Sequence, residues 1–224
     1  FYFLAGLFMT LRATRLTTFC LTSLISLSVL SSDLAAKETE FEITPMVGYR
    51  FGGDFYTPVG ETETKIKLAE EISYGGIFAW SIDRDKQGEV FISHYETNFT
   101  ELTSLPTQAP VNKDAMSITY AHLGGNVRVS EGFMPVYVAG GLGLTHLAPD
   151  DAVFDSETRF SMNLGLMTKA ALTESLSLTM SGRVFATFFD SEKQIFCGDG
   201  ACLISIDSDL WLQTELNLGL AFKF

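Results

Sequence analysis

The stretch Leu210-Trp211-Leu212-Gln213-Thr214-Glu215-Leu216-Asn217-Leu218-Gly219-Leu220-Ala221-Phe222-Lys223-Phe224 alternates between two kinds of residue along its whole length. One face carries leucine, threonine and phenylalanine, and the other mixes small and polar residues with Trp211, Glu215 and Lys223. Because successive side chains point to opposite sides of a β-strand, the pattern predicts a strand with two different faces. The mixed face suits a narrow polar interior, which indicates that the apolar face lies outward.

The same alternation predicts seven further strands. Four are clear, over residues 41–51, 136–145, 160–169 and 176–188, and three are softer, over 73–82, 89–99 and 116–129. In the stretch 89–99 the face that carries Ser93, His94 and Glu96 stays open. Gly124 and Gly125 mark a candidate bulge in the stretch 116–129.

The connections between these strands alternate in length. Short turns are expected at 83–88, 130–134 and 171–175, and longer polar loops at 52–70, 100–114, 148–157 and 190–205. This alternation is typical of an eight-stranded antiparallel transmembrane β-barrel with short periplasmic turns and longer extracellular loops. Closure of the sheet pairs every backbone group, as a lipid environment requires. A soluble lipocalin-like barrel is the alternative.

The inward faces of the clear strands carry charges of both signs, so ion pairs can compensate their burial. We expect a lumen charge network made of six residues: Glu42, Arg50, Lys169, Arg183, Glu215 and Lys223.

The first 36 residues have the features of a targeting segment. Arg12 and Arg15 precede an apolar run over 16–30, and small residues lead to Ala36. We therefore expect a secretory signal peptide over 1–36, a mature barrel domain over 37–224 and a true start at Met9, downstream of residues 1–8. A retained membrane anchor helix is the alternative.

Removal of that segment takes Cys20 and leaves Cys197 and Cys202, which are separated by four residues in a glycine-containing stretch. An even pair of cysteines in an exported protein predicts a disulfide. A metal site is the alternative, although no histidine lies nearby to complete a ligand set.

The net charge of -12 and the pI near 4.6 argue against nucleic acid as a partner, because phosphate binding needs a basic surface. We expect the acidic clusters of the loops to be solvated faces, with divalent-cation bridging to lipopolysaccharide as an alternative. They comprise Asp150, Asp151, Asp155, Glu157, Asp199, Asp207 and Asp209.

The C-terminal alternation resembles the terminal assembly signal of bacterial outer-membrane proteins, carried here by Leu216, Leu218, Leu220, Phe222 and Phe224. Further stretches resemble a proteobacterial family of small outer-membrane β-barrel proteins of the porin-like superfamily. They are residues 43–53, residues 137–145, and residues 188–191 together with 196–198. The resemblance implies a place in the outer membrane of a Gram-negative cell, among lipid and lipopolysaccharide. It also implies the barrel assembly machinery as a partner of the last strand, and we expect a monomer.

Some proteins with this fold are lipid A deacylases that use a serine and a histidine, so Ser93 with His94 and Ser161 with His146 are candidate pairs. Neighbours on one strand point to opposite faces, so Ser93 and His94 cannot act together. Gly140 to Gly143 continue a strand, with no following helix or lysine to make a phosphate loop. We expect no catalytic residue, cofactor or metal.

The sequence therefore predicts a non-enzymatic integral outer-membrane protein that stabilises the envelope or presents its loops outside. A narrow channel for small or hydrophobic solutes is the alternative, followed by a lipid A-modifying enzyme.

Overall fold

The computed structural model describes residues 39–59, 62–102, 114–151, 155–189, 194–198, 201–205 and 210–224. The predicted signal peptide and start site lie outside these residues and stay predictions. Within the described ranges, the structure contains no helix that is long and apolar enough to cross a membrane.

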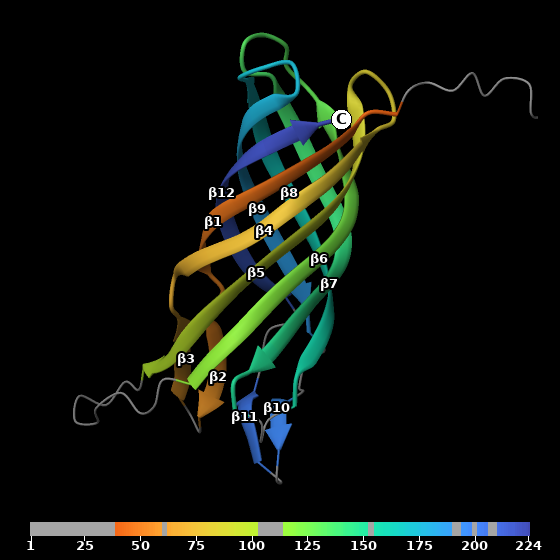
Figure 1. The fold of residues 1–224 in the computed structure, drawn as a ribbon. Coiled ribbons are helices and arrows are strands. Elements are labelled where there is room, and N and C mark those ends of the chain that lie inside the picture. Colours follow the sequence, from red (N-terminus) through yellow and green to blue (C-terminus); the bar gives the residue numbers. More distant parts are fainter. Residues whose placement is uncertain are drawn as a thin grey trace, which may run out of the picture. The chain divides into compact units, whose positions relative to one another are not determined.

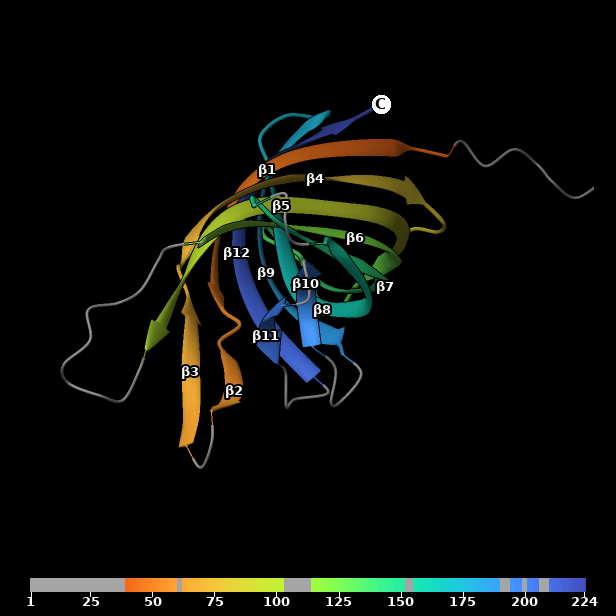
Figure 2. The same ribbon diagram turned by 90° about the horizontal axis from the view of Figure 1, so that it is seen from below.

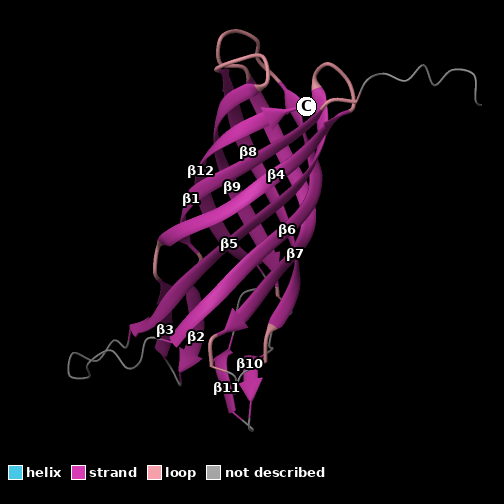
Figure 3. Ribbon diagram, viewed as in Figure 1, coloured by secondary structure: helices cyan, strands magenta, loops and turns pink. Residues whose placement is uncertain are grey.

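Eight long antiparallel strands form a closed barrel (Figures 1 and 3). Neighbours in sequence pair throughout, β1 pairs with β12, and the pairing of β5 with β6 completes the ring. The predicted eight-stranded antiparallel barrel is confirmed. Its strands are β1 (Phe41–Gly52), β4 (Glu71–Ser81), β5 (Lys86–Leu102), β6 (Asp114–Arg128), β7 (Val136–Pro149), β8 (Glu157–Ala171), β9 (Leu176–Phe188) and β12 (Leu210–Lys223).

The strands are staggered around the barrel. A path through directly opposed residues that starts at Thr158 on β8 returns to the same strand at Thr168, ten residues further on. The stagger makes the strands tilt relative to the barrel axis and sets the width of the interior. The path runs through His146, Thr119, His94, Tyr74, Val47, Leu218 and Met180.

The connections have the predicted alternation of length. The turns at 82–85, 129–135 and 172–175 lie at the end of the barrel that holds the C-terminus. At the other end two small hairpins extend the loops: β2 (Phe55–Val59) with β3 (Thr62–Leu68), and β10 (Gln194–Gly198) with β11 (Ala201–Ser205) (Figure 2). Strand β3 also pairs with the far end of β5, so the first hairpin continues the barrel wall.

The two open questions about the softer strands are now answered. On β5, Glu89, Phe91 and Ser93 are buried in the interior, whereas His94 and Glu96 lie on the outer face. The candidate bulge at Gly124 and Gly125 is wrong, because both glycines pair in unbroken register with β5 and β7. Glycine serves here to let the strands approach closely rather than to add an unpaired residue.

The outer wall is apolar over most of its area, as a lipid-facing surface must be. At the C-terminal end an aromatic cluster covers it, in which the Phe41 ring lies 5.8 Å from that of Phe78 and 6.1 Å from that of Phe224. Trp80 packs over Gly88 on the adjacent strand, where any side chain would meet the indole. Aromatic side chains gathered at one barrel end are typical of an interfacial girdle.

Candidate functional site: a filled barrel lumen

The interior of the barrel is the place where the structure concentrates buried charge. Four of its charged side chains, Arg50, Arg183, Glu89 and Glu215, are at most 1% exposed. A buried charge of this kind needs an opposite charge and hydrogen bonds around it. The charges lie in three layers along the lumen.

Arg50 is at the centre of the first layer. Its Nη2 is paired with Glu215 Oε2 and donates to Ser93 Oγ at 2.7 Å. Ser93 Oγ in turn donates to Glu215 Oε1 at 2.8 Å, and Ser73 Oγ donates to the same oxygen at 2.5 Å. The carboxylate of Glu215 therefore accepts bonds from three other strands, β1, β4 and β5, and ties that half of the barrel together.

Three aromatic rings enclose the Arg50 guanidinium. Its Cζ lies 4.8 Å from the ring centroid of Tyr95, 4.5 Å from that of Tyr120 and 4.6 Å from that of Phe185. Cation–π attraction at such distances stabilises a desolvated guanidinium. Gln213 links the two tyrosines, because it accepts from the Tyr120 hydroxyl at 2.8 Å and donates to the Tyr95 hydroxyl. This group, the Arg50 cage, fills the cross-section of the lumen from β1, β5, β6, β9 and β12.

The second layer lies nearer the C-terminal end of the barrel. Arg183 Nη1 donates to Glu89 Oε1 at 2.8 Å and to Asn163 Oδ1 at 2.9 Å. Asn126 Nδ2 donates to the other oxygen of Glu89 at 3.1 Å, and the Arg183 guanidinium lies 4.4 Å from the Phe91 ring centroid. The sequence analysis missed Glu89, because it lies on a strand that is polar on both faces.

The third layer is smaller. Lys169 Nζ donates to Glu42 Oε1 at 2.6 Å and to Gln87 Oε1 at 3.0 Å. Lys223, placed by the sequence analysis in the same network, lies instead at the barrel rim, where its half-exposed side chain pairs with Glu40 at 2.6 Å. The strand ends at this residue, so its side chain reaches water.

At the loop end, apolar side chains close the interior above the Arg50 cage. Trp211 Nε1 donates to the carbonyl of Gly53 at 2.7 Å, which ties the start of the first loop to the last strand. The buried apolar residues of this end are Leu68, Met116, Ile118, Leu147, Phe189 and Trp211.

Neither of the candidate serine and histidine pairs forms. Ser93 faces the lumen and His94 the outside, where its Nδ1 lies 2.8 Å from Thr119 Oγ1. His146 is likewise outside, with its Nδ1 2.9 Å from Thr158 Oγ1. Ser161 pairs with a histidine that the sequence analysis did not single out.

That histidine is His122, whose Nε2 lies 2.9 Å from Ser161 Oγ. The serine is fully buried and the histidine is 3% exposed, stacked against Tyr120 and Phe185. A nucleophile and base need a space beside them for the reacting group of a substrate. In the described structure this pair is instead covered by the Arg50 cage.

Strands β10 and β11 hold Cys197 and Cys202. Their register places Cys197 directly opposite Cys202. The side chains lie outside the described part of the structure, so the disulfide stays a prediction.

Two further predicted features concern ions. Within the described ranges no three histidine, cysteine, aspartate or glutamate side chains gather as metal ligands would. Asp150, Asp151 and Asp155 are exposed at the loop end, and Glu157 pairs with Arg159 at 2.8 Å. The remaining acidic loop residues Asp199, Asp207 and Asp209 lie outside the described residues.

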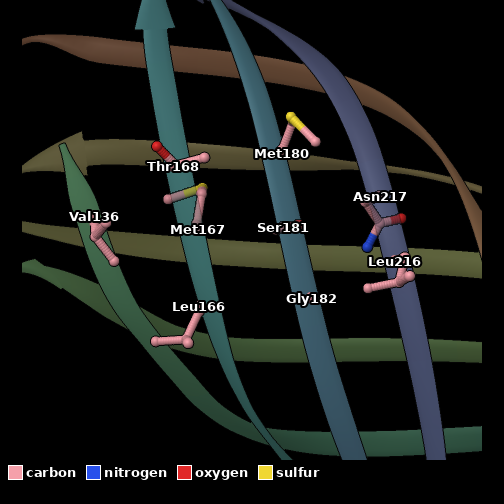
Figure 4. A pocket seen from close by; sticks show the side chains of 9 residues that line it. All are labelled: Val136, Leu166, Met167, Thr168, Met180, Ser181, Gly182, Leu216 and Asn217. Atoms are coloured by element: carbon pink, nitrogen blue, oxygen red, sulfur yellow. The ribbon is translucent and has the colours of Figure 1, made fainter. Parts of the chain in front are cut away.

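In the described part of the outer wall, a hollow of about 400 Å³ lies across β7, β8, β9 and β12 (Figure 4). Gly182 lies between Leu166 and Leu216 in the paired strands, so a missing side chain between two exposed leucines creates it. The strands behind it are paired without interruption. The hollow is therefore a depression in the lipid-facing surface and not an opening into the lumen.

A closed antiparallel barrel with an apolar wall and a charged, filled interior is a small integral membrane barrel of the outer-membrane type. No protein-family model matches the sequence, and no curated protein matches it. Among solved structures, the outer-membrane protein OprG from Pseudomonas aeruginosa is similar, with a TM-score of 0.54 and 12% identity over 83% of this chain and 95% of that chain. The outer-membrane protein AlkL, solved in DMPC lipid bilayers, has a TM-score of 0.55 and 10% identity over 87% of this chain and 94% of that chain. At such identities the likeness shows the fold.

Proposed function

We propose that this chain is a plugged barrel of the bacterial outer membrane, which supports the envelope and displays its loops outside without conducting solutes through its lumen. The observation that carries the proposal is the Arg50 cage. A guanidinium that is 1% exposed, with rings on several sides and a carboxylate bound to it, occupies the space that a solute would need.

The second layer strengthens the proposal. Glu89, Arg183 and Asn163 form a bonded bridge across the lumen from β5, β9 and β8. Both charged partners are 1% exposed, so passage of a solute would break buried ion pairs in two successive layers. Leaving one charge of a buried pair uncompensated costs about 3–5 kcal/mol, so separating these pairs inside the lumen is unfavourable.

The two buried layers of paired side chains in the lumen argue against a channel for solutes. The hollow at Gly182 lies on the outer wall and does not lead into the lumen. The lipid A-modifying alternative would need an accessible nucleophile, and the Ser161 and His122 pair is buried under aromatic rings. The arrangement therefore favours a structural barrel over both.

Conductance across a planar bilayer tests the proposal. The folded protein should give no steady single-channel steps, whereas Phe185→Ala should leak, because it removes a ring that contacts Arg50 and His122. Phe160→Ala is the matched control, since it removes a ring of the same size from the outer wall. Steady steps from the unaltered protein that Phe185→Ala leaves unchanged would contradict a plugged lumen.

The envelope role has its own readout. Cells that lack this chain should become more sensitive to detergent, and the unaltered protein should restore resistance. If the Phe185→Ala variant folds and restores it less well, the closed lumen matters to the barrier.

A further inference from the structure

The apolar belt of the outer wall ends early on one side of the barrel. On β5 the outward residues are apolar up to Ile92 and then become His94 and Glu96. On β6 they are apolar up to Ala121 and then become Thr119 and Ser117. An outward carboxylate within a lipid-facing strand is costly unless it reaches the polar layer of the membrane.

The opposite side of the barrel differs. On β9 and β12 large apolar side chains stay exposed as far as the loop ends of the strands, at Phe188 and Leu210. Leu210 lies thirteen residues from the C-terminal-side end of β12 at Lys223, whereas Ala121 lies seven residues from the corresponding end of β6 at Arg128. With the rise and tilt of barrel strands, this offset corresponds to on the order of 10 Å along the barrel axis.

At the end of the barrel that holds the C-terminus, the apolar belt extends further on the β5–β6 side than on the β9–β12 side. The turn between β6 and β7, residues 129–135, exposes Val129, Met134 and above all Phe133, whose side chain is 84% exposed. Gly132 within this turn has a φ of +123°, a backbone conformation that residues with side chains rarely adopt. The corresponding turn between β8 and β9 exposes Leu172 beside the strand end but carries threonine, glutamate and serine beyond it.

One explanation covers both ends. On the β5–β6 side the belt starts lower on the strands and continues into the β6–β7 turn, while on the β9–β12 side it spans the strands themselves. A flat membrane can match such an oblique belt only if the barrel leans within it. Exposed Phe and Met side chains at the edge of a lipid-facing wall then meet the headgroup boundary, where aromatic side chains are favoured.

We propose that residues 129–134 are a membrane anchor that inserts into the phospholipid of the periplasmic leaflet and holds the barrel at a lean. This inference rests on the membrane placement proposed above. The occupant of the exposed Phe133 surface is lipid, because that surface continues the lipid-facing wall of β6 through Val127 and Val129. At the other end the lean places the bonded pair of His94 and Thr119 in the outer polar layer.

Tryptophan fluorescence in vesicles tests the anchor. Phe133→Trp, Thr173→Trp and Leu164→Trp are made separately in a Trp80→Phe, Trp211→Phe background and refolded into phosphatidylcholine vesicles with or without bromine on the acyl chains. Leu164 is exposed in the middle of β8 and reports membrane insertion, and Thr173 is the matched polar turn position. Phe133→Trp should lose most of its emission in brominated vesicles, as Leu164→Trp does, and Thr173→Trp should lose little.

The outcomes separate the two proposals. If Leu164→Trp is not quenched, the membrane placement fails. If Leu164→Trp is quenched but Phe133→Trp behaves like Thr173→Trp, the anchor is wrong and the placement stands. If the emission of Phe133→Trp shifts to the blue only at high protein density and without quenching, a second copy covers the turn, which also overturns the anchor. Should the tryptophan-free background fail to fold, nitroxide labels on cysteines at the same three positions, with Cys197→Ser and Cys202→Ser, give the same comparison.

Discussion

Arg50 and Glu215 lie directly opposite each other on the first and last strands of the barrel, and their side chains form a buried ion pair at this seam. The seam joins the parts of the chain that are furthest apart in sequence. A slip of one residue between these strands would turn one of the two charges toward lipid and leave the other buried alone. The ion pair therefore favours the correct register of the seam.

Removal of one partner should therefore be costly. We expect Glu215→Ala to lower the free energy of unfolding by about 3–5 kcal/mol, because Arg50 is left buried without its counter-charge. Urea unfolding in phospholipid vesicles, followed by the gel mobility of the folded barrel, measures the change. Glu71→Ala, at an exposed glutamate, should cost little. If Glu215→Ala and Glu71→Ala lower the free energy of unfolding equally, the buried ion pair does not stabilise the barrel more than an exposed glutamate does.

A second prediction concerns the close approach of β6 and β7. A Cβ on Gly124 would collide with the backbone of Gly140 and Gly141, whereas a Cβ on Gly140 would meet nothing closer than the Asn163 carbonyl at 3.4 Å. We expect Gly124→Ala to destabilise the barrel by about 1–3 kcal/mol through overpacking. Gly140→Ala should be tolerated in the same unfolding measurement, and the reverse order would contradict the packing.

The cysteine pair gives a third prediction. Protein exported to an oxidising compartment should have Cys197 and Cys202 joined, so it should resist alkylation until it is reduced. Closing so small a ring stabilises by about 2 kcal/mol in the chain-entropy model. The added stability should make the β10–β11 hairpin more resistant to proteolysis in the oxidised than in the reduced protein. Mass spectrometry of the alkylated protein shows whether the bond between the two cysteines has formed. Free alkylation of the exported, unreduced protein would rule it out.

The topology can be checked on whole cells. A short epitope inserted at residues 199–200, between β10 and β11, should bind antibody on intact cells, because the longer loops of such barrels face outward. The same epitope in the turn at 172–175 should bind only after the outer membrane is permeabilised. The opposite result would invert the orientation of the barrel.

The alternation of the last strand predicted the architecture because its two faces differ so clearly in polarity. The same alternation in the other clear strands, together with the last one, correctly assigned Arg50, Arg183, Glu42, Lys169 and Glu215 to the interior face. Strand β5 could not be oriented in this way, because Ser93, His94 and Glu96 make both of its faces polar. On β5 the apolar belt of the outer wall ends early, at Ile92, so the outer face beyond it is polar like the inner face. Without a difference in polarity between the two faces, the sequence cannot show which face points inward. Glu89 was missed for the same reason.

Other features depend on distance in the fold rather than on pattern. His122 on β6 meets Ser161 on β8 over Gly143 of the intervening strand β7, 39 positions away in sequence, and no local motif marks their pairing. The strands of the hairpins β2–β3 and β10–β11 are only five to seven residues long, so any alternation in them is too brief to predict a strand. The rim position of Lys223 follows from where the strand ends, and sequence patterns place such ends poorly.

The two tryptophans occupy contrasting places, with Trp80 on the outer wall over Gly88 and Trp211 inside, bonded to Gly53. The first indole therefore senses the membrane interface, and the second senses the joining of the first loop to the last strand. Versions of the chain that keep only one of them would time insertion and sealing separately during refolding, and so reveal whether the sheet enters the bilayer before its edges meet.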